Sequence, residues 1–104
     1  MSHAYVQEKL AQAVGELNKA GDIRVRLYKA FKCFLPLFTR DLPEDLQAEL
    51  LELKRALSRL PPEYEDQATA VVTIESMTDQ EAQALATRIF ELYLRLQRNR
   101  ASGK

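Results

Sequence analysis

Apolar side chains recur every three or four residues along most of the chain, which is the spacing of one buried helical face. A first such stretch spans residues 6–20 and a second spans residues 23–35. Between them, Gly21 can end the first helix in a left-handed conformation, and Asp22 can cap the start of the second. Pro36 then ends or kinks the second helix, because proline has no backbone N–H to donate.

The third stretch begins at Asp41-Leu42-Pro43-Glu44, which has the form of a capping box. Six leucines recur in it at intervals of four or three residues: Leu42, Leu46, Leu50, Leu53, Leu57 and Leu60. On a helix they form a stripe only about 80° wide, which is typical of a coiled-coil contact. Pro61-Pro62 ends this helix.

Residues 68–77 carry an ambiguous pattern. The β-branched run at 71–74 favours a strand, but a lone short strand has no partner elsewhere in the chain. We therefore predict a short helix over residues 68–76. Thr78 and Glu81 form a second capping box, which opens the last helix. Its outer face is predicted to carry Arg88, Glu91, Arg95 and Arg98, with Phe90 and Leu92 at the margins of the inward face.

These elements predict an all-α fold, a small bundle of four longer helices and one short helix. The length of 104 residues leaves no room for a second core, so we expect a single domain over 1–104 with frayed ends at 1–4 and 101–104. A composition that is 46% hydrophobic and 29% charged excludes a disordered chain.

Basic and acidic residues cancel over the whole chain but not locally. Residues 1–40 carry 7 basic and 3 acidic groups (+4), residues 41–81 carry 3 and 11 (−8), and residues 82–104 carry 5 and 1 (+4). Either helices of opposite charge pack side by side, or a separate basic face serves a partner. Because there is no overall positive charge, we do not expect nucleic acid or a membrane as the partner.

The single cysteine, Cys33, fits a reducing compartment. The first residues lack the apolar core of a signal peptide, and no stretch is long enough to span a bilayer. We expect a cytoplasmic protein of bacterial type.

Residue types that perform catalysis or bind metals are scarce. One histidine, His3, and one cysteine cannot make a zinc site, and the three glycines do not form a phosphate-binding loop. We therefore expect no enzyme activity, no catalytic residues, no metal and no cofactor, and a passive thiol at Cys33.

One pattern resembles a known metal motif. Glu49-x-x-Glu52 followed by Glu63-x-x-Asp66 is similar to the paired acidic motif of the all-helical MazG-type nucleotide pyrophosphohydrolases. The resemblance implies Mg²⁺ held by these carboxylates, and it makes a Mg²⁺-dependent nucleotide hydrolase one alternative function. The second pair follows two prolines and the gap is short for that family, so we expect a solvated acidic face instead.

A basic edge on the second helix supplies the other alternative. Its members are Arg24, Arg26, Lys29 and Lys32. Such a row can contact phosphates, which gives weak nucleic-acid binding. The competing interpretation is that these side chains pair with the acidic residues of the third helix: Glu44, Asp45, Glu49 and Glu52.

The leading hypothesis rests on leucines in excess of what one small bundle must bury. The candidate interface residues are Leu46, Leu50, Leu53, Leu57, Leu92 and Leu94. Leftover apolar surface marks an interface, so we predict a non-catalytic interaction or assembly module that forms a homodimer or another homo-oligomer, or that binds another protein. The alternative is that all these leucines belong to the chain's own core.

Residues 37–96 also resemble short uncharacterised bacterial all-helical proteins. The resemblance lies in two segments, 41–46 and 77–82, and in the helix that leads to Ile89 and Tyr93. It implies an all-α fold and carries no activity.

Overall fold

The computed structural model describes residues 3–57 and 66–101, and every regular element in these ranges is helical. The elements are α1 (His3–Leu17), α2 (Ile23–Phe34), the 3₁₀ turn η1 (Thr39–Asp41), α3 (Glu44–Leu57), α4 (Asp66–Glu75) and α5 (Asp79–Ala101). The predicted all-α class, with four longer helices and a shorter one, is confirmed.

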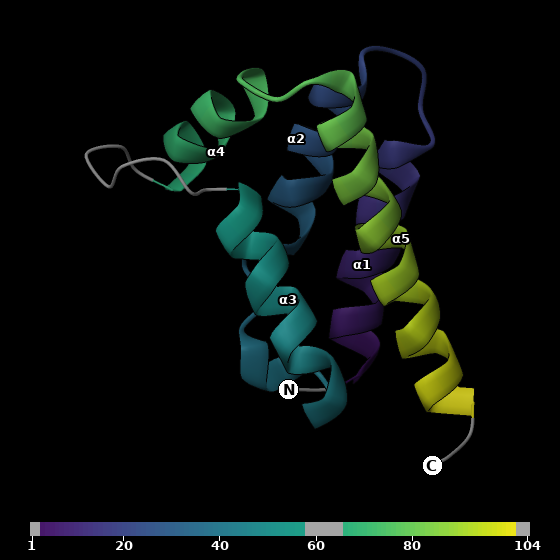
Figure 1. Ribbon diagram of the computed structural model, residues 1–104. Helices are drawn as coiled ribbons and strands as arrows, with labels where there is room; N and C mark the ends of the chain where they lie inside the picture. Colours follow the sequence, from purple (N-terminus) through teal and green to yellow (C-terminus); the bar gives the residue numbers. More distant parts are fainter. Residues whose placement is uncertain (1–2, 58–65, 102–104) are drawn as a thin grey trace.

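Figure 1 shows that α1, α2, α3 and α5 run roughly along one direction and alternate in sense. α1 packs against α2 and α5, while α3 packs against α5. α4 lies across the end of the bundle at which α3 ends and α5 begins (Figure 1). The β-branched run is helical in α4, where Thr73 and Ile74 are buried. Packing against α2 replaces the strand partner that the chain does not offer.

Local capping determines where α2 and α5 begin. Gly21 has a positive φ of 118°, and the Asp22 carboxylate accepts the backbone N–H of Arg24 at 2.8 Å. At the start of α5, the Thr78 hydroxyl accepts the N–H of Glu81 at 3.1 Å, and the Glu81 carboxylate accepts the N–H of Thr78 at 2.9 Å. Both predicted starts are confirmed, because each depends on residues adjacent in the sequence.

The capping box predicted at residues 41–44 is wrong. Asp41 is buried in η1, and its carboxylate accepts the backbone N–H of Phe38 at 3.0 Å. The first turn of α3 is closed instead by the Pro43 carbonyl, which accepts the N–H of Leu46 at 2.9 Å. Asp41 thus accepts a hydrogen bond within the turn before α3, whereas the sequence pattern assigned it to the start of α3.

The core is one cluster to which all five α-helices contribute. Phe31 and Phe34 of α2 meet edge to face, with ring centroids 5.5 Å apart. The leucine row that runs from Leu42, just before α3, to Leu57 at the end of α3 lies in the same cluster and is at most 3% exposed. Leu60 lies outside the described residues. The narrow leucine stripe therefore faces the interior of the chain's own bundle.

Candidate functional site

The candidate interface leucines divide sharply by burial. Five of them belong to the core and are at most 1% exposed: Leu46, Leu50, Leu53, Leu57 and Leu92. Leu94 is 37% exposed. A partner can reach the α3 row only if the bundle opens. The sequence predicted these leucines as a contact surface, whereas the structure places them in the core. The reason is that α4 and α5 both pack against α3 and cover its apolar stripe.

An exposed apolar surface lies instead on α5. Phe90 is 44% exposed and Leu94 is 37% exposed, and a spacing of four residues puts them on one face of the helix. Gln83 and Thr87 continue the same face toward the start of α5 at intervals of four and three, and both are exposed. At about 100° per residue, the four side chains span about 60° of the helix surface. We call Gln83, Thr87, Phe90 and Leu94 the α5 seam; none of them is charged.

A groove of about 210 Å³ runs beside the α5 seam, between α5 and the α1–α2 junction. Its apolar lining comes from three helices: Val14, Leu17, Ile23, Ala86 and Phe90. Its polar lining consists of Asn18, Arg26, Gln83 and Thr87. The sequence pattern placed Phe90 only at a margin of the inward face. The signal in the sequence that could have indicated this surface is the uncharged row at positions 83, 87, 90 and 94, which has helical spacing.

Arg26 lines this groove and is not a free phosphate ligand. Its Nη1 donates to the carbonyl of Leu17 at 2.8 Å, and its Nε donates to the carbonyl of Gly21 at 2.9 Å. The last carbonyls of a helix lack partners within the helix, so Arg26 supplies donors to the end of α1 and to the turn that follows.

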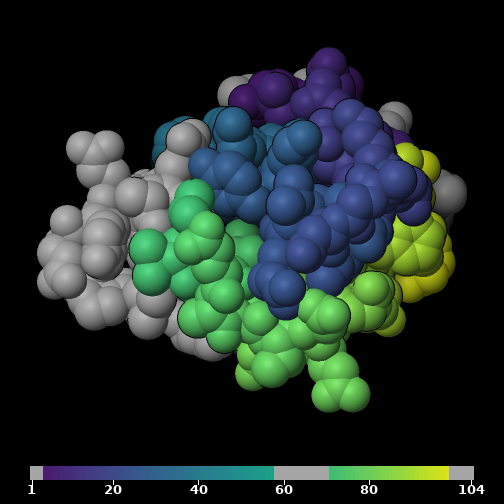
Figure 2. All heavy atoms as spheres, turned by 90° about the horizontal axis from the view of Figure 1, so that it is seen from above, coloured from purple at the N-terminus to yellow at the C-terminus, as the bar shows by residue number. Residues whose placement is uncertain are grey.

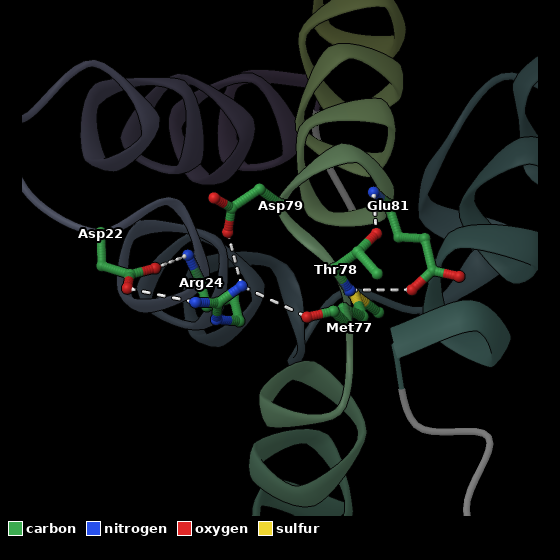
Figure 3. Close-up of polar contacts among 6 residues, drawn as sticks. All are labelled: Asp22, Arg24, Met77, Thr78, Asp79 and Glu81. Carbon is green, nitrogen blue, oxygen red and sulfur yellow. Dashed lines mark hydrogen bonds and ion pairs between the residues drawn. The ribbon is translucent and has the colours of Figure 1, made fainter.

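Arg24 is likewise engaged within the chain. Its Nη1 donates to Asp79 at 2.6 Å and to the Met77 carbonyl at 3.2 Å, and Nη2 lies 3.5 Å from Asp22 (Figure 3). The start of α2 is thereby joined to the α4–α5 turn. In the view of Figure 2, residues of α2 and the green residues of the α4–α5 region lie side by side. Two of the four predicted basic-edge residues thus have structural roles.

The other two, Lys29 and Lys32, are exposed. The predicted pairing of the basic edge with the α3 carboxylates does not hold for Arg24 and Arg26, whose partners lie at the end of α1 and in the turns before α2 and α5. Glu49 and Glu52 pair instead with Arg88 of α5, at 3.1 Å each. Arg88 therefore points toward α3 and not into solvent on the outer face of α5.

The acidic motif is only partly described. Glu63 and the side chain of Asp66 lie outside the described residues. The described pair, Glu49 and Glu52, is bound to the Arg88 guanidinium, and no group of three potential ligands for a metal ion occurs in the described part of the chain. Both described carboxylates are therefore engaged by a cationic side chain of the chain itself.

Cys33 is a partly buried free thiol. Burial raises its pKa, and the negative charge of Glu16 raises it further, against the opposing effect of nearby lysines. The thiol form, which is the unreactive form, is favoured.

Compared with models of protein families, with curated proteins and with solved structures, the chain matches none of them. No described helix is both long enough and apolar enough to cross a membrane.

Proposed function

We propose that this chain is a non-catalytic interaction module that forms a homodimer through the α5 seam. One observation carries the proposal: Phe90 and Leu94, one turn apart on α5, are 44% and 37% exposed beside a groove with apolar and polar lining residues. Each alone is an ordinary surface residue. Together with the apolar residues of the groove lining, they make a surface of the kind that a partner covers.

The charge distribution favours a second copy as that partner. A two-fold interface brings the same surface of each subunit together, so any charge near the axis meets an identical charge. The α5 seam carries only amide, hydroxyl and apolar side chains. The seams of two copies can therefore pack together without repulsion between like charges. Its four-three-four spacing is also that of side chains that interlock between two helices.

The proposed geometry places each Phe90 against the groove of the other subunit, with Leu94 packing alongside. Two side chains do not supply the roughly 800 Å² per partner of a stable interface. We therefore expect the contact to include the groove wall formed by Val14 and Leu17 of α1. Phe90→Glu replaces the aromatic ring that packs in this contact with a carboxylate.

The test is the solution mass, measured by light scattering after gel filtration at low and high salt. The expected result is a dimer whose mass does not change with salt for the natural chain, and a folded monomer for Phe90→Glu. Leu51→Glu is the matched control, because Leu51 is 38% exposed but lies on α3. A monomeric natural chain, or a Phe90→Glu variant that stays dimeric, contradicts the proposal.

A further inference from the structure

A polar hollow between α1 and α2 gathers an unusual number of lysines. Its volume is about 460 Å³, and its charged and nucleophilic lining residues are Lys9, Glu16, Lys19, Lys29, Lys32 and Cys33. We call this the lysine hollow. Its lysines come from both helices and from the segment that follows α1, so the packing of α1 on α2 is what brings them together.

The positive charges of the lysine hollow are only partly neutralised. Its one carboxylate, on Glu16, pairs with Lys19 at 3.2 Å. Lys9, Lys29 and Lys32 form no ion pair with any described residue. Burial raises the pKa of the Cys33 thiol, so this side chain adds no negative charge near neutral pH. The hollow therefore has three ammonium groups that no carboxylate balances.

Two of these ammonium groups are partly positioned by aromatic rings. The Lys9 Nζ lies 5.6 Å from the centre of the Tyr5 ring, and the Lys32 Nζ lies 5.6 Å from the centre of the Tyr28 ring. Such contacts restrict long side chains without neutralising them. A ligand that binds there meets ammonium groups that have already lost part of their conformational freedom, which lowers the entropic cost of binding.

We propose that the lysine hollow binds a compact anion made of linked phosphate groups. Lysine ammonium groups bind phosphate oxygens as point charges, and several of them around one recess match several linked phosphates. A long nucleic acid is a poorer match, because the chain has no net charge and Arg24 and Arg26 are engaged within the fold. Free polyphosphate and the phosphate chain of a nucleotide share this chemistry.

Calorimetric titration of the full chain with inorganic tripolyphosphate tests the site. Lys29→Gln with Lys32→Gln should weaken binding by about tenfold, since each exposed charge contributes modestly. Arg55→Gln with Arg98→Gln is the matched control, because it removes the same charge from exposed positions on α3 and α5. This control should change the affinity by less than about twofold.

A second readout uses Cys33, which lines the lysine hollow. Tripolyphosphate should slow its alkylation by iodoacetamide, a neutral reagent that the lysines do not attract. ATP in place of tripolyphosphate separates the two sources: equal affinity indicates that only the phosphate chain is bound, and tighter binding of ATP indicates a nucleotide. Either outcome supports the site.

Three results overturn it. They are no binding of either phosphate compound, equal losses in the lysine and arginine double variants, or tighter binding of a short single-stranded oligonucleotide than of tripolyphosphate. The second result indicates a general charge effect, and the third indicates a nucleic-acid surface. None of them bears on the α5 dimer, which involves a different face of the chain.

Discussion

Arg88 and Glu49, 39 residues apart in the sequence, form a bidentate ion pair between α5 and α3. Arg88 Nε donates to one oxygen of the Glu49 carboxylate at 3.1 Å, and Nη2 donates to the other at 3.2 Å. This hydrogen bonding raises the pKa of Arg88, so the guanidinium stays charged. The pair is partly exposed, with side-chain exposures of 36% and 22%, and it fixes the relative position of two helices whose apolar faces are already buried.

Replacing Arg88 by methionine should lower the free energy of unfolding by about 1 kcal/mol, because solvent screens a partly exposed pair. Urea denaturation measures the loss. Glu49→Gln should cost a similar amount, and the double variant should cost less than the two single losses added together. Glu52→Gln should cost less than Glu49→Gln, because Glu52 makes a single contact with Arg88 and is 63% exposed. Strictly additive losses would show that the two side chains do not interact.

The α3 leucine row gives a second prediction about stability. Leu50 is fully buried, so Leu50→Ala should lower the free energy of unfolding by about 2–5 kcal/mol through lost burial and a cavity. Leu51→Ala, at a 38% exposed position on the same helix, should cost less than about 1 kcal/mol. If the row were a contact between subunits, Leu50→Ala would lower the dimer mass while the monomer remained as stable as before.

Substitution by alanine should change the stability of the chain in opposite directions at Gly15, which lies within α1, and at Gly21, which lies in the turn after α1. Gly21 has a φ of 118°, so Gly21→Ala should destabilise the chain by about 1 kcal/mol through backbone strain. Gly15 lies within α1, and a Cβ there meets no atom within 4 Å. Gly15→Ala should therefore stabilise it by about 0.5 kcal/mol. Thermal unfolding followed by circular dichroism compares the two. The same sign for both substitutions would contradict this description of the turn.

The pKa of Cys33 leads to a prediction about reactivity. Because burial and then Glu16 raise this pKa, the folded chain holds less thiolate at a given pH than an unperturbed cysteine does. Alkylation by iodoacetamide should be slower in the folded chain than in the same chain in urea. Its rate should also rise with pH at a higher midpoint in the folded state. A lower midpoint in the folded chain would mean that the lysines outweigh burial.

Local features of the fold were predictable from the sequence, and tertiary ones were not. Gly21, Asp22 and the Thr78–Glu81 box act on their immediate neighbours, so their residue types determine where helices end and begin. Asp41 shows the limit of such reasoning, because two adjacent elements compete for one carboxylate. The assignment of that carboxylate to η1 depends on how the chain turns before α3.

The candidate surfaces were less predictable because exposure depends on which helices are neighbours. Leu92 and Phe90 stand at the two margins of the inward face of α5, yet Leu92 is 1% exposed and Phe90 is 44% exposed. Periodicity gives the angular position of each side chain on its helix, but not which side another helix covers. The same reasoning explains Arg88, which lies close enough to α3 to bind Glu49.

The contacts of Arg24 with Met77 and Asp79 have a consequence for the order of folding. They join positions 53 and 55 residues apart, whereas α1 and α2 pack across a short turn. Closing a long loop costs more chain entropy than closing a short one, so the α1–α2 hairpin should form early and the Arg24 contacts late. Loss of the guanidinium should then speed unfolding and leave the folding rate nearly unchanged.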